Sequence, residues 1–184
     1  SLVPVMDWLE THLGPYAFGT QAGAVIVPQT PQMVAIEHHP FWHVSKNSAG
    51  SESVHAHEAA HGWLGNAVRI ACWEDFVLSE GGASYLAAKA LGAVHGERAE
   101  EEIWAVYQRR LDRANAQYKG PVLPESCSPE DAVDAGLFNE LSYMRGAFFF
   151  REVEELLGVE VLLEEIGHFY ILNTGKSVRM RDLI

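Results

Sequence analysis

The 184-residue sequence is poor in basic residues and in cysteine, and it lacks a long apolar run. Lysine and arginine number 13 against 25 aspartates and glutamates, which gives a formal net charge of −12. This balance argues against nucleic acid or an anionic membrane as the main partner. No apolar run reaches the roughly 18 residues needed to span a bilayer, and no signal peptide is recognisable. We therefore expect a soluble fragment, whose compartment and membrane association the sequence leaves open.

Cys72 and Cys127 are too few and too far apart in the sequence for a disulfide framework. The sequence leaves a single bridge between them open and favours two buried thiols. A hydrophobic fraction of 48% suits a globular protein with a real core, and residues 1–184 are expected to form one domain. Because the first residue is serine and not methionine, we expect this domain to be a piece of a longer protein.

The pattern along the chain predicts a small β part followed by a larger helical part. Residues 23–36 combine β-forming valines and isoleucines with two prolines, which indicates an extended segment. Residues 45–53 are polar and indicate a loop. Periodic apolar positions, separated by glycine or proline, predict helices over residues 2–13, 52–67, 80–95, 97–118, 139–157 and 159–173. This order of elements favours an α+β fold.

The segment SVHAHEAAHGWLGN, residues 53–66, contains a pattern typical of a metal site. His57 and His61 are four positions apart, so on a helix both side chains project from one face, one turn apart. Imidazole nitrogens suit zinc. Glu58 projects beside the pair, where it can take a proton from a water on the metal. Such a short motif also occurs by chance, so it needs further support.

A third ligand is available in the segment WEDFVLSEGGASYL. A catalytic zinc needs three protein ligands and an open position. Glu80 follows His61 after 18 intervening residues and begins the next expected helix. Two packed helices with such a connection would bring its carboxylate beside the histidines. The same carboxylate would also stabilise a helix start through the helix dipole, so both roles stay open.

Taken together, these residues resemble the zinc aminopeptidases of the membrane alanyl aminopeptidase type, a gluzincin family. The family pattern is HExxHxWxGN, then eighteen residues from the second histidine to a glutamate, and it is matched here by His57, Glu58, His61, Trp63, Gly65, Asn66 and Glu80. The resemblance implies a thermolysin-like zincin catalytic domain with one Zn²⁺ per chain. It implies that His57, His61 and Glu80 hold this ion. Glu58 is then the general base.

A later segment adds the catalytic tyrosine that the family carries in a Tyr-x-Lys-Gly-Ala pattern. Here SYMRGAFFF gives Tyr143 followed by Gly146 and Ala147, with Arg145 in place of the lysine. The resemblance implies that the Tyr143 phenol donates a hydrogen bond to the oxyanion of the tetrahedral intermediate, which contributes roughly 3–4 kcal/mol in comparable sites. On an amphipathic helix without the motif, the same tyrosine would be taken for a core residue.

The family also has a Gly-Ala-Met-Glu-Asn strand upstream, whose glutamate binds the α-amine of the substrate. In QMVAIEHHP only Ala35 and Glu37 match its commonest form, and the connection to His57 is shorter than usual. The resemblance implies that Glu37 holds the N-terminal ammonium, and the alternative is a surface residue of an edge strand. Three nearby histidines form a local cluster for which a part in the pocket is left open, and they are not expected to bind the metal: His38, His39 and His43.

The resemblance implies hydrolysis of the first peptide bond of a peptide that has a free N-terminus. Family members are several times longer, so we expect a β-domain before and a helical domain after this unit in the parent chain, and the activity of the unit alone is left open. Three alternatives remain: a gluzincin endopeptidase in which Glu37 does not reach the cleft, a pseudoenzyme that binds proteins, and a helical domain with a chance motif.

Overall fold

A computed structural model of the chain describes residues 2–28, 34–118, 127 and 139–183. The helices are α1 (Val3–Leu13), α2 (Glu52–Ala60), α3 (Gly82–His95), α4 (Glu97–Gln117), α6 (Glu140–Leu157) and α7 (Val159–Asn173). The strands are β1 (Gly23–Val27), β2 (Ala35–Ile36), β3 (Phe41–Ser45), β4 (Arg69–Ile70) and β5 (Ser177–Val178). This mostly helical architecture with a small sheet part agrees with the predicted α+β layout.

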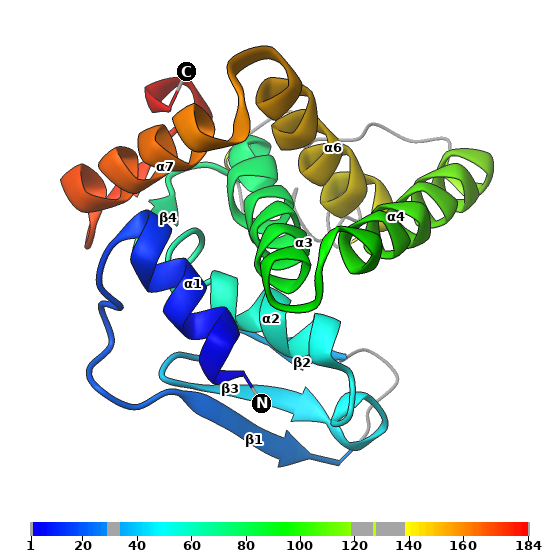
Figure 1. Ribbon diagram of the computed structural model, residues 1–184, viewed down its shortest axis with the longest axis horizontal. Helices are drawn as coiled ribbons and strands as arrows, with labels where there is room; N and C mark the ends of the chain where they lie inside the picture. Colours follow the sequence, from blue (N-terminus) through cyan, green and yellow to red (C-terminus); the bar gives the residue numbers. More distant parts are fainter. Residues whose placement is uncertain (1, 29–33, 119–126, 128–138, 184) are drawn as a thin grey trace.

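The larger sheet lies at one end of the molecule, below α2 in Figure 1. Its strand order is β1-β3-β2, with β3 parallel to β1 and antiparallel to β2. The central strand β3 is built on Trp42 and Val44, which are buried, whereas Val25 and Ile26 of β1 are exposed. The sequence analysis gave residues 41–44 no element and treated Ser45 as the start of a loop, so the centre of this sheet was missed.

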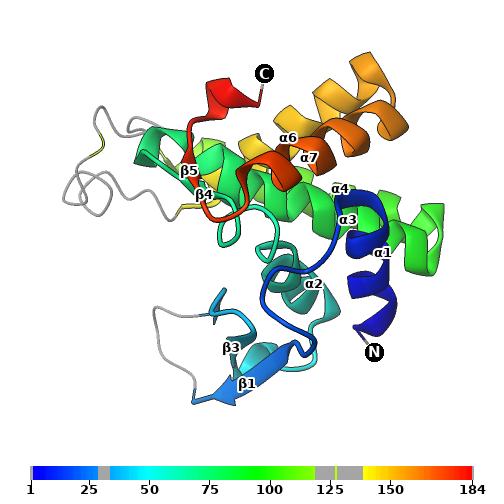
Figure 2. The ribbon, with the colours of Figure 1, turned by 90° about the vertical axis from the view of Figure 1, so that its left-hand side faces the viewer.

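The helices form the rest of the molecule, and α2 lies between them and the sheet (Figure 2). α3 packs against α2, α4 and α6, and its many buried alanines allow these neighbours to approach closely. α1 packs against α3 and α7. The buried Trp63 donates its indole N–H to the carbonyl of Gly14 at 2.9 Å, just after α1. The motif tryptophan thereby joins the end of α2 to α1.

α6 closely approaches the π-helical turn η3 (Val77–Gly81), which precedes α3. A Cβ atom on Gly146 would lie 2.6 Å from the Cα of Gly81. Such a distance is far inside van der Waals contact, so the two backbones can meet only where both residues are glycine. This contact fixes the position of η3 against α6. It explains why residue 146, between Arg145 and Ala147, is a glycine.

Cys72 and Cys127 are joined by a disulfide, with their Cα atoms 4.7 Å apart. The expectation of two buried thiols was therefore wrong. Pairing depends on the distance between the two residues in space, and a sequence separation of 55 residues does not reveal that distance. In the described part of the chain, no helix combines the length and the apolarity that crossing a membrane requires.

The glycine contact leads to a stability prediction. Gly146→Ala places a methyl group against the η3 backbone, and we expect it to lower the free energy of unfolding by about 1–3 kcal/mol, as overpacking of a filled interior does. Urea unfolding measures this. Gly50→Ala is the matched control, because a Cβ there meets no atom within 4 Å. Equal unfolding midpoints for the two variants would contradict the prediction.

Candidate metal centre

α2 begins at a capping serine and ends where the motif's glycines begin. The Ser51 hydroxyl accepts a hydrogen bond from a first-turn N–H at 3.4 Å. The helix ends at Ala60, not at residue 67 as predicted. Gly65 has a φ of +122°, a conformation that favours glycine, and a Cβ on it would lie 2.6 Å from Nδ1 of His61. Glycine at this position turns the chain and leaves room for the imidazole.

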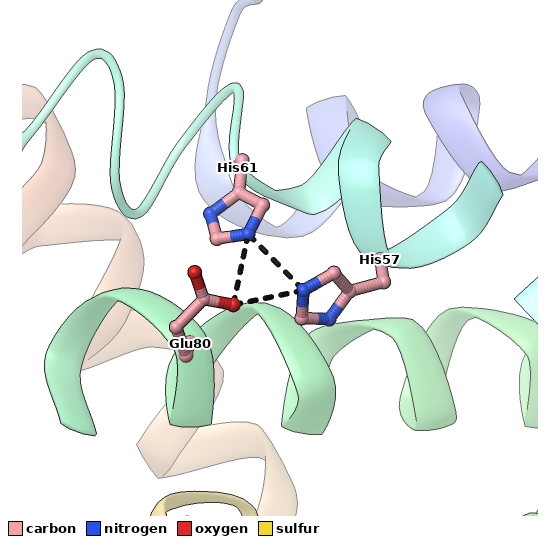
Figure 3. Close-up of side chains that lie close together, drawn as sticks. All are labelled: His57, His61 and Glu80. Atoms are coloured by element: carbon pink, nitrogen blue, oxygen red, sulfur yellow. Dashed lines mark hydrogen bonds and ion pairs between the residues drawn. The ribbon is translucent and has the colours of Figure 1, made fainter. Parts of the chain in front are cut away.

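His57, His61 and Glu80 converge on one point (Figure 3). Nε2 of His57 lies 3.0 Å from Oε2 of Glu80, and Nε2 of His61 lies 3.3 Å from the same oxygen. The two Nε2 atoms are 3.1 Å apart. Ligand atoms placed 2.0–2.1 Å from a tetrahedral zinc would be about 3.3 Å from one another. The atom types and their spacing therefore fit one zinc ion, and three protein ligands leave a fourth position open.

Neighbouring groups orient both imidazoles. Nδ1 of His61 lies 3.1 Å from the Leu64 carbonyl oxygen, and Nδ1 of His57 lies 3.3 Å from Oγ of Ser84. When Nδ1 carries the proton and donates it, the lone pair of Nε2 points into the site. The sequence analysis missed Ser84. Its position four residues after Glu80 was the available signal, because it places Ser84 one helical turn from the third ligand.

The electrostatics of the site favour a positive charge at this point. Burial lowers the pKa of His61, but attraction to the Glu80 carboxylate outweighs it and raises the pKa to about 10. Burial likewise raises the pKa of Glu80, but the His61 and His57 imidazoles outweigh it and hold that pKa far below its usual range. The carboxylate thus favours the protonated form of His61 when no other cation is bound, and a metal ion would take the place of that proton.

The three other predicted site residues line the same cavity, whose volume is about 1220 Å³: Glu37, Glu58 and Tyr143. Ligand atoms of Glu37, Glu58 and His61 all lie within 4.8 Å of one another. The ring of Tyr143 lies 6.0 Å from the ring of His57, centroid to centroid. Burial raises the pKa of Glu58 and that of Tyr143, so the phenol stays protonated and can donate a hydrogen bond. The structure brings all six predicted residues together.

Asn66 links the zinc-binding motif to the strand that carries Glu37. Its side-chain amide donates a hydrogen bond to the Glu37 carbonyl oxygen. β2 ends one residue earlier, where Ile36 pairs with His43 of β3. The strand pairing and the Asn66 hydrogen bond together hold Glu37 at the cavity. They do so although QMVAIEHHP matches the family pattern at only two positions.

His39 supports the end of α2 instead of shaping the pocket. Its Nε2 lies 2.9 Å from the Glu58 carbonyl oxygen, and its Nδ1 lies 2.6 Å from the Tyr16 hydroxyl. The Gly62 N–H bonds to the Ala59 carbonyl, so the helix leaves the Glu58 carbonyl to the imidazole. Burial lowers the pKa of His39 to about 4. The neutral ring therefore donates to Glu58 and accepts from Tyr16.

The three histidines near Glu37, whose part in the pocket the sequence left open, lie away from the cavity wall. Among the described residues that line the cavity, none is His38, His39 or His43. His38 and His43 instead contact each other, with their Nδ1 atoms 3.2 Å apart. Sequence proximity to Glu37 did not predict the neighbours of these side chains, since His38 and His39 lie between β2 and β3 and not within a strand.

Comparison with known families gives one match, to the peptidase family M1 domain, over residues 23–184. The chain belongs to peptidase family M1. It is 30% identical to leucine aminopeptidase 2 of Aspergillus niger over 178 residues, which cover 92% of this chain and 28% of that protein. It is 29% identical to leucine aminopeptidase 2 of Emericella nidulans over 182 residues, which cover 95% of this chain and 29% of that protein.

Solved structures share the fold of this M1 domain. Yeast LTA4 hydrolase in complex with bestatin superposes with a TM-score of 0.86 at 24% identity, over 99% of this chain and 30% of that one. An M1 zinc metallopeptidase from Deinococcus radiodurans, bound to a Tyr-Ser-Ala substrate, superposes with a TM-score of 0.76 at 22% identity, over 97% of this chain and 38% of that one. The chain thus spans under a third of the length of the leucine aminopeptidases that it matches.

Metal analysis tests the ligand set. We expect wild-type protein, purified without chelator, to carry close to one zinc per chain by inductively coupled plasma mass spectrometry. Glu80→Ala removes one ligand and should lower zinc affinity by at least about tenfold, since even a lost outer-shell contact has that effect. Glu164→Ala, on exposed α7 surface, loses the same charge and should retain zinc. Equal zinc in both variants would exclude Glu80 as a ligand.

The support of α2 by His39 gives a second prediction. His39→Ala leaves the Glu58 carbonyl without its donor, so the C-terminal turn of α2 that carries His57 and His61 loosens. We expect zinc affinity to fall by about tenfold with the ligands intact, as measured by competition with a chromogenic chelator. His38→Ala is the control, since His38 is exposed and its imidazole contacts the sheet histidine His43 and not α2. The zinc affinity of His39→Ala should be lower than that of His38→Ala. Equal zinc affinities would contradict the role of His39 in supporting α2.

Proposed function

We propose that this chain is the catalytic domain of a zinc aminopeptidase, which removes the first residue of a peptide with a free N-terminus. One observation carries the proposal: the Glu37 carboxylate lies within 4.8 Å of ligand atoms of Glu58 and His61. An enzyme that cuts only at the N-terminus must bind an ammonium group next to the scissile bond. A carboxylate beside the metal centre meets this need. An endopeptidase binds no N-terminal ammonium next to the scissile bond, so it does not require a carboxylate there.

The proposal also covers the subfamily of the domain, its extent along the chain and the domains that flank it in the parent protein. The spacing of the zinc-binding motif supports a thermolysin-like domain of the membrane alanyl aminopeptidase type. A continuous core from Val5 to Val178 supports a single domain over residues 1–184. We further propose that the parent chain adds a β-domain and a helical domain, which is supported by the greater length of the leucine aminopeptidase relatives.

The residues of the site fit distinct catalytic roles. A zinc ion held by His57, His61 and Glu80 would supply a Lewis acid that brings the pKa of water toward neutrality. Glu58, whose pKa burial raises, accepts the proton of the attacking water and passes it to the leaving amine. Two further groups act on the substrate. The protonated Tyr143 donates to the developing oxyanion, and Glu37 binds the ammonium.

A pair of variants separates recognition from catalysis. Glu58→Gln removes the general base, and we expect kcat to fall by about 10²–10⁴-fold with zinc retained. Glu37→Gln removes the partner of the ammonium, and we expect KM for leucine para-nitroanilide to rise by about tenfold or more, because a charged hydrogen bond is lost. Steady-state kinetics with matched zinc content measure both effects.

The same assay distinguishes the alternatives. Wild-type protein should cleave Leu-Gly-Gly and leave its N-acetylated form intact. Internal cleavage of N-blocked peptides at a comparable rate would replace the aminopeptidase with an endopeptidase. Full zinc occupancy without hydrolysis of either peptide would support a pseudoenzyme that uses the fold for binding.

A further inference from the structure

The wall of the cavity formed by α4 carries positive charge, opposite in sign to the carboxylates of Glu37 and Glu58 on the other side. α4 contributes positions three or four residues apart, which lie on one face of the helix: Tyr107, Arg110, Arg113, Ala114 and Gln117. Two of these residues are arginines, in a chain with a net charge of −12. In the described part of the chain, neither arginine forms an ion pair with a carboxylate of the metal centre. The cavity is thus acidic on one side and basic on another.

The guanidinium groups retain hydrogen-bond donors for a ligand. Arg110 donates its Nε–H to the Glu140 carboxylate at 2.6 Å, and its guanidinium lies 5.6 Å from the centre of the Tyr107 ring. A guanidinium has five N–H donors, so one contact leaves others for a further acceptor. Arg113 is exposed, and no hydrogen bond or ion pair joins it to another described residue. Within the described part of the chain, its guanidinium donors are therefore available to a ligand in the cavity.

The two charged walls lie apart in the structure. Glu37 directly follows β2, in the sheet at the lower part of Figure 1, whereas α4 extends away from the sheet at the upper right. A peptide whose ammonium is held at Glu37 has its first peptide bond at the metal centre, so its leaving part continues into the rest of the cavity. The cavity volume of about 1220 Å³ exceeds the roughly 300–1,000 Å³ of typical small-molecule pockets, so it has room for this leaving part.

We propose that Arg110 and Arg113 form a subsite for a carboxylate on the leaving part of the peptide. The inference rests on the proposed aminopeptidase function and specifies its substrate class. Guanidinium groups bind carboxylates through paired, charge-assisted hydrogen bonds. The carboxylate is either the C-terminus of a short peptide or an aspartate or glutamate side chain, and both present the same chemistry to the arginines.

Peptide binding to a zinc-loaded Glu58→Gln protein tests the subsite without turnover. The probes are Leu-Gly-Gly, its C-terminal amide and Leu-Asp-Gly amide, titrated by isothermal calorimetry. We expect either carboxylate peptide to bind about fivefold more tightly than Leu-Gly-Gly amide, which is the size of effect that a solvent-exposed ion pair produces. The peptide that binds more tightly identifies the source of the carboxylate.

Arginine variants, each added to Glu58→Gln, assign the effect to this wall. Arg113→Gln should abolish the preference for the carboxylate peptides. Arg109→Gln is the matched control, because it removes the same charge from α4 at a position that does not line the cavity, and it should retain the preference. Glu140→Gln releases Arg110 from its ion pair and should increase the preference.

Three results would overturn the subsite: equal affinity for the acid and the amide, an equal loss of preference in Arg113→Gln and Arg109→Gln, or no binding of any probe. A failure of the proposed function looks different. Wild-type protein would then cleave no peptide, while the dependence of binding on the carboxylate and on Arg113 would persist. Hydrolysis with equal affinity for acid and amide would retain the aminopeptidase and remove the subsite alone.

Discussion

The burial of the Glu80 carboxylate beside two imidazoles is the constraint on which the rest of the site depends. Glu80 is 4% exposed and His61 is 1% exposed. Removing such groups from water costs several kcal/mol per charge unless they are paired. Their pairing requires His57, His61 and Glu80 to meet within hydrogen-bond distance. Three local features make this meeting possible: the end of α2 at Ala60, the π-helical turn η3, and the glycine contact that sets η3 against α6.

The predicted site residues that the structure brings together were chosen from spacing along one helix or between two neighbouring helices. A four-residue interval fixes His57 and His61 on one face whatever surrounds them. Glu80 was found from its spacing after His61 and Tyr143 through a family pattern, and both have a physical basis here because Gly81 and Gly146 allow their elements to touch. The convergence of His57, His61 and Glu80 could therefore be predicted well from local sequence.

The features that sequence analysis missed depend on contacts between distant segments. The pairing of Cys72 with Cys127 and the donation from His39 to the Glu58 carbonyl are set by tertiary structure, so no local interval encodes them. The predicted extension of α2 to residue 67 failed for another reason. Apolar residues such as Trp63 continue the helical pattern, but the helix already ends at Ala60, and Gly65 at positive φ turns the chain and leaves space for the His61 imidazole.

The opposite charges of the cavity walls have a consequence for the direction in which a peptide binds. With its ammonium at Glu37, a peptide places each charged end beside a group of the opposite sign. The reversed peptide would place a carboxylate beside Glu37 and Glu58 and an ammonium beside Arg113, so both ends would be repelled. Specificity is a difference between two affinities, and like-charge contacts inside a partly buried cavity are costly. The carboxylates beside the metal and the arginines of α4 would thus select one orientation, which puts the first peptide bond at the metal centre.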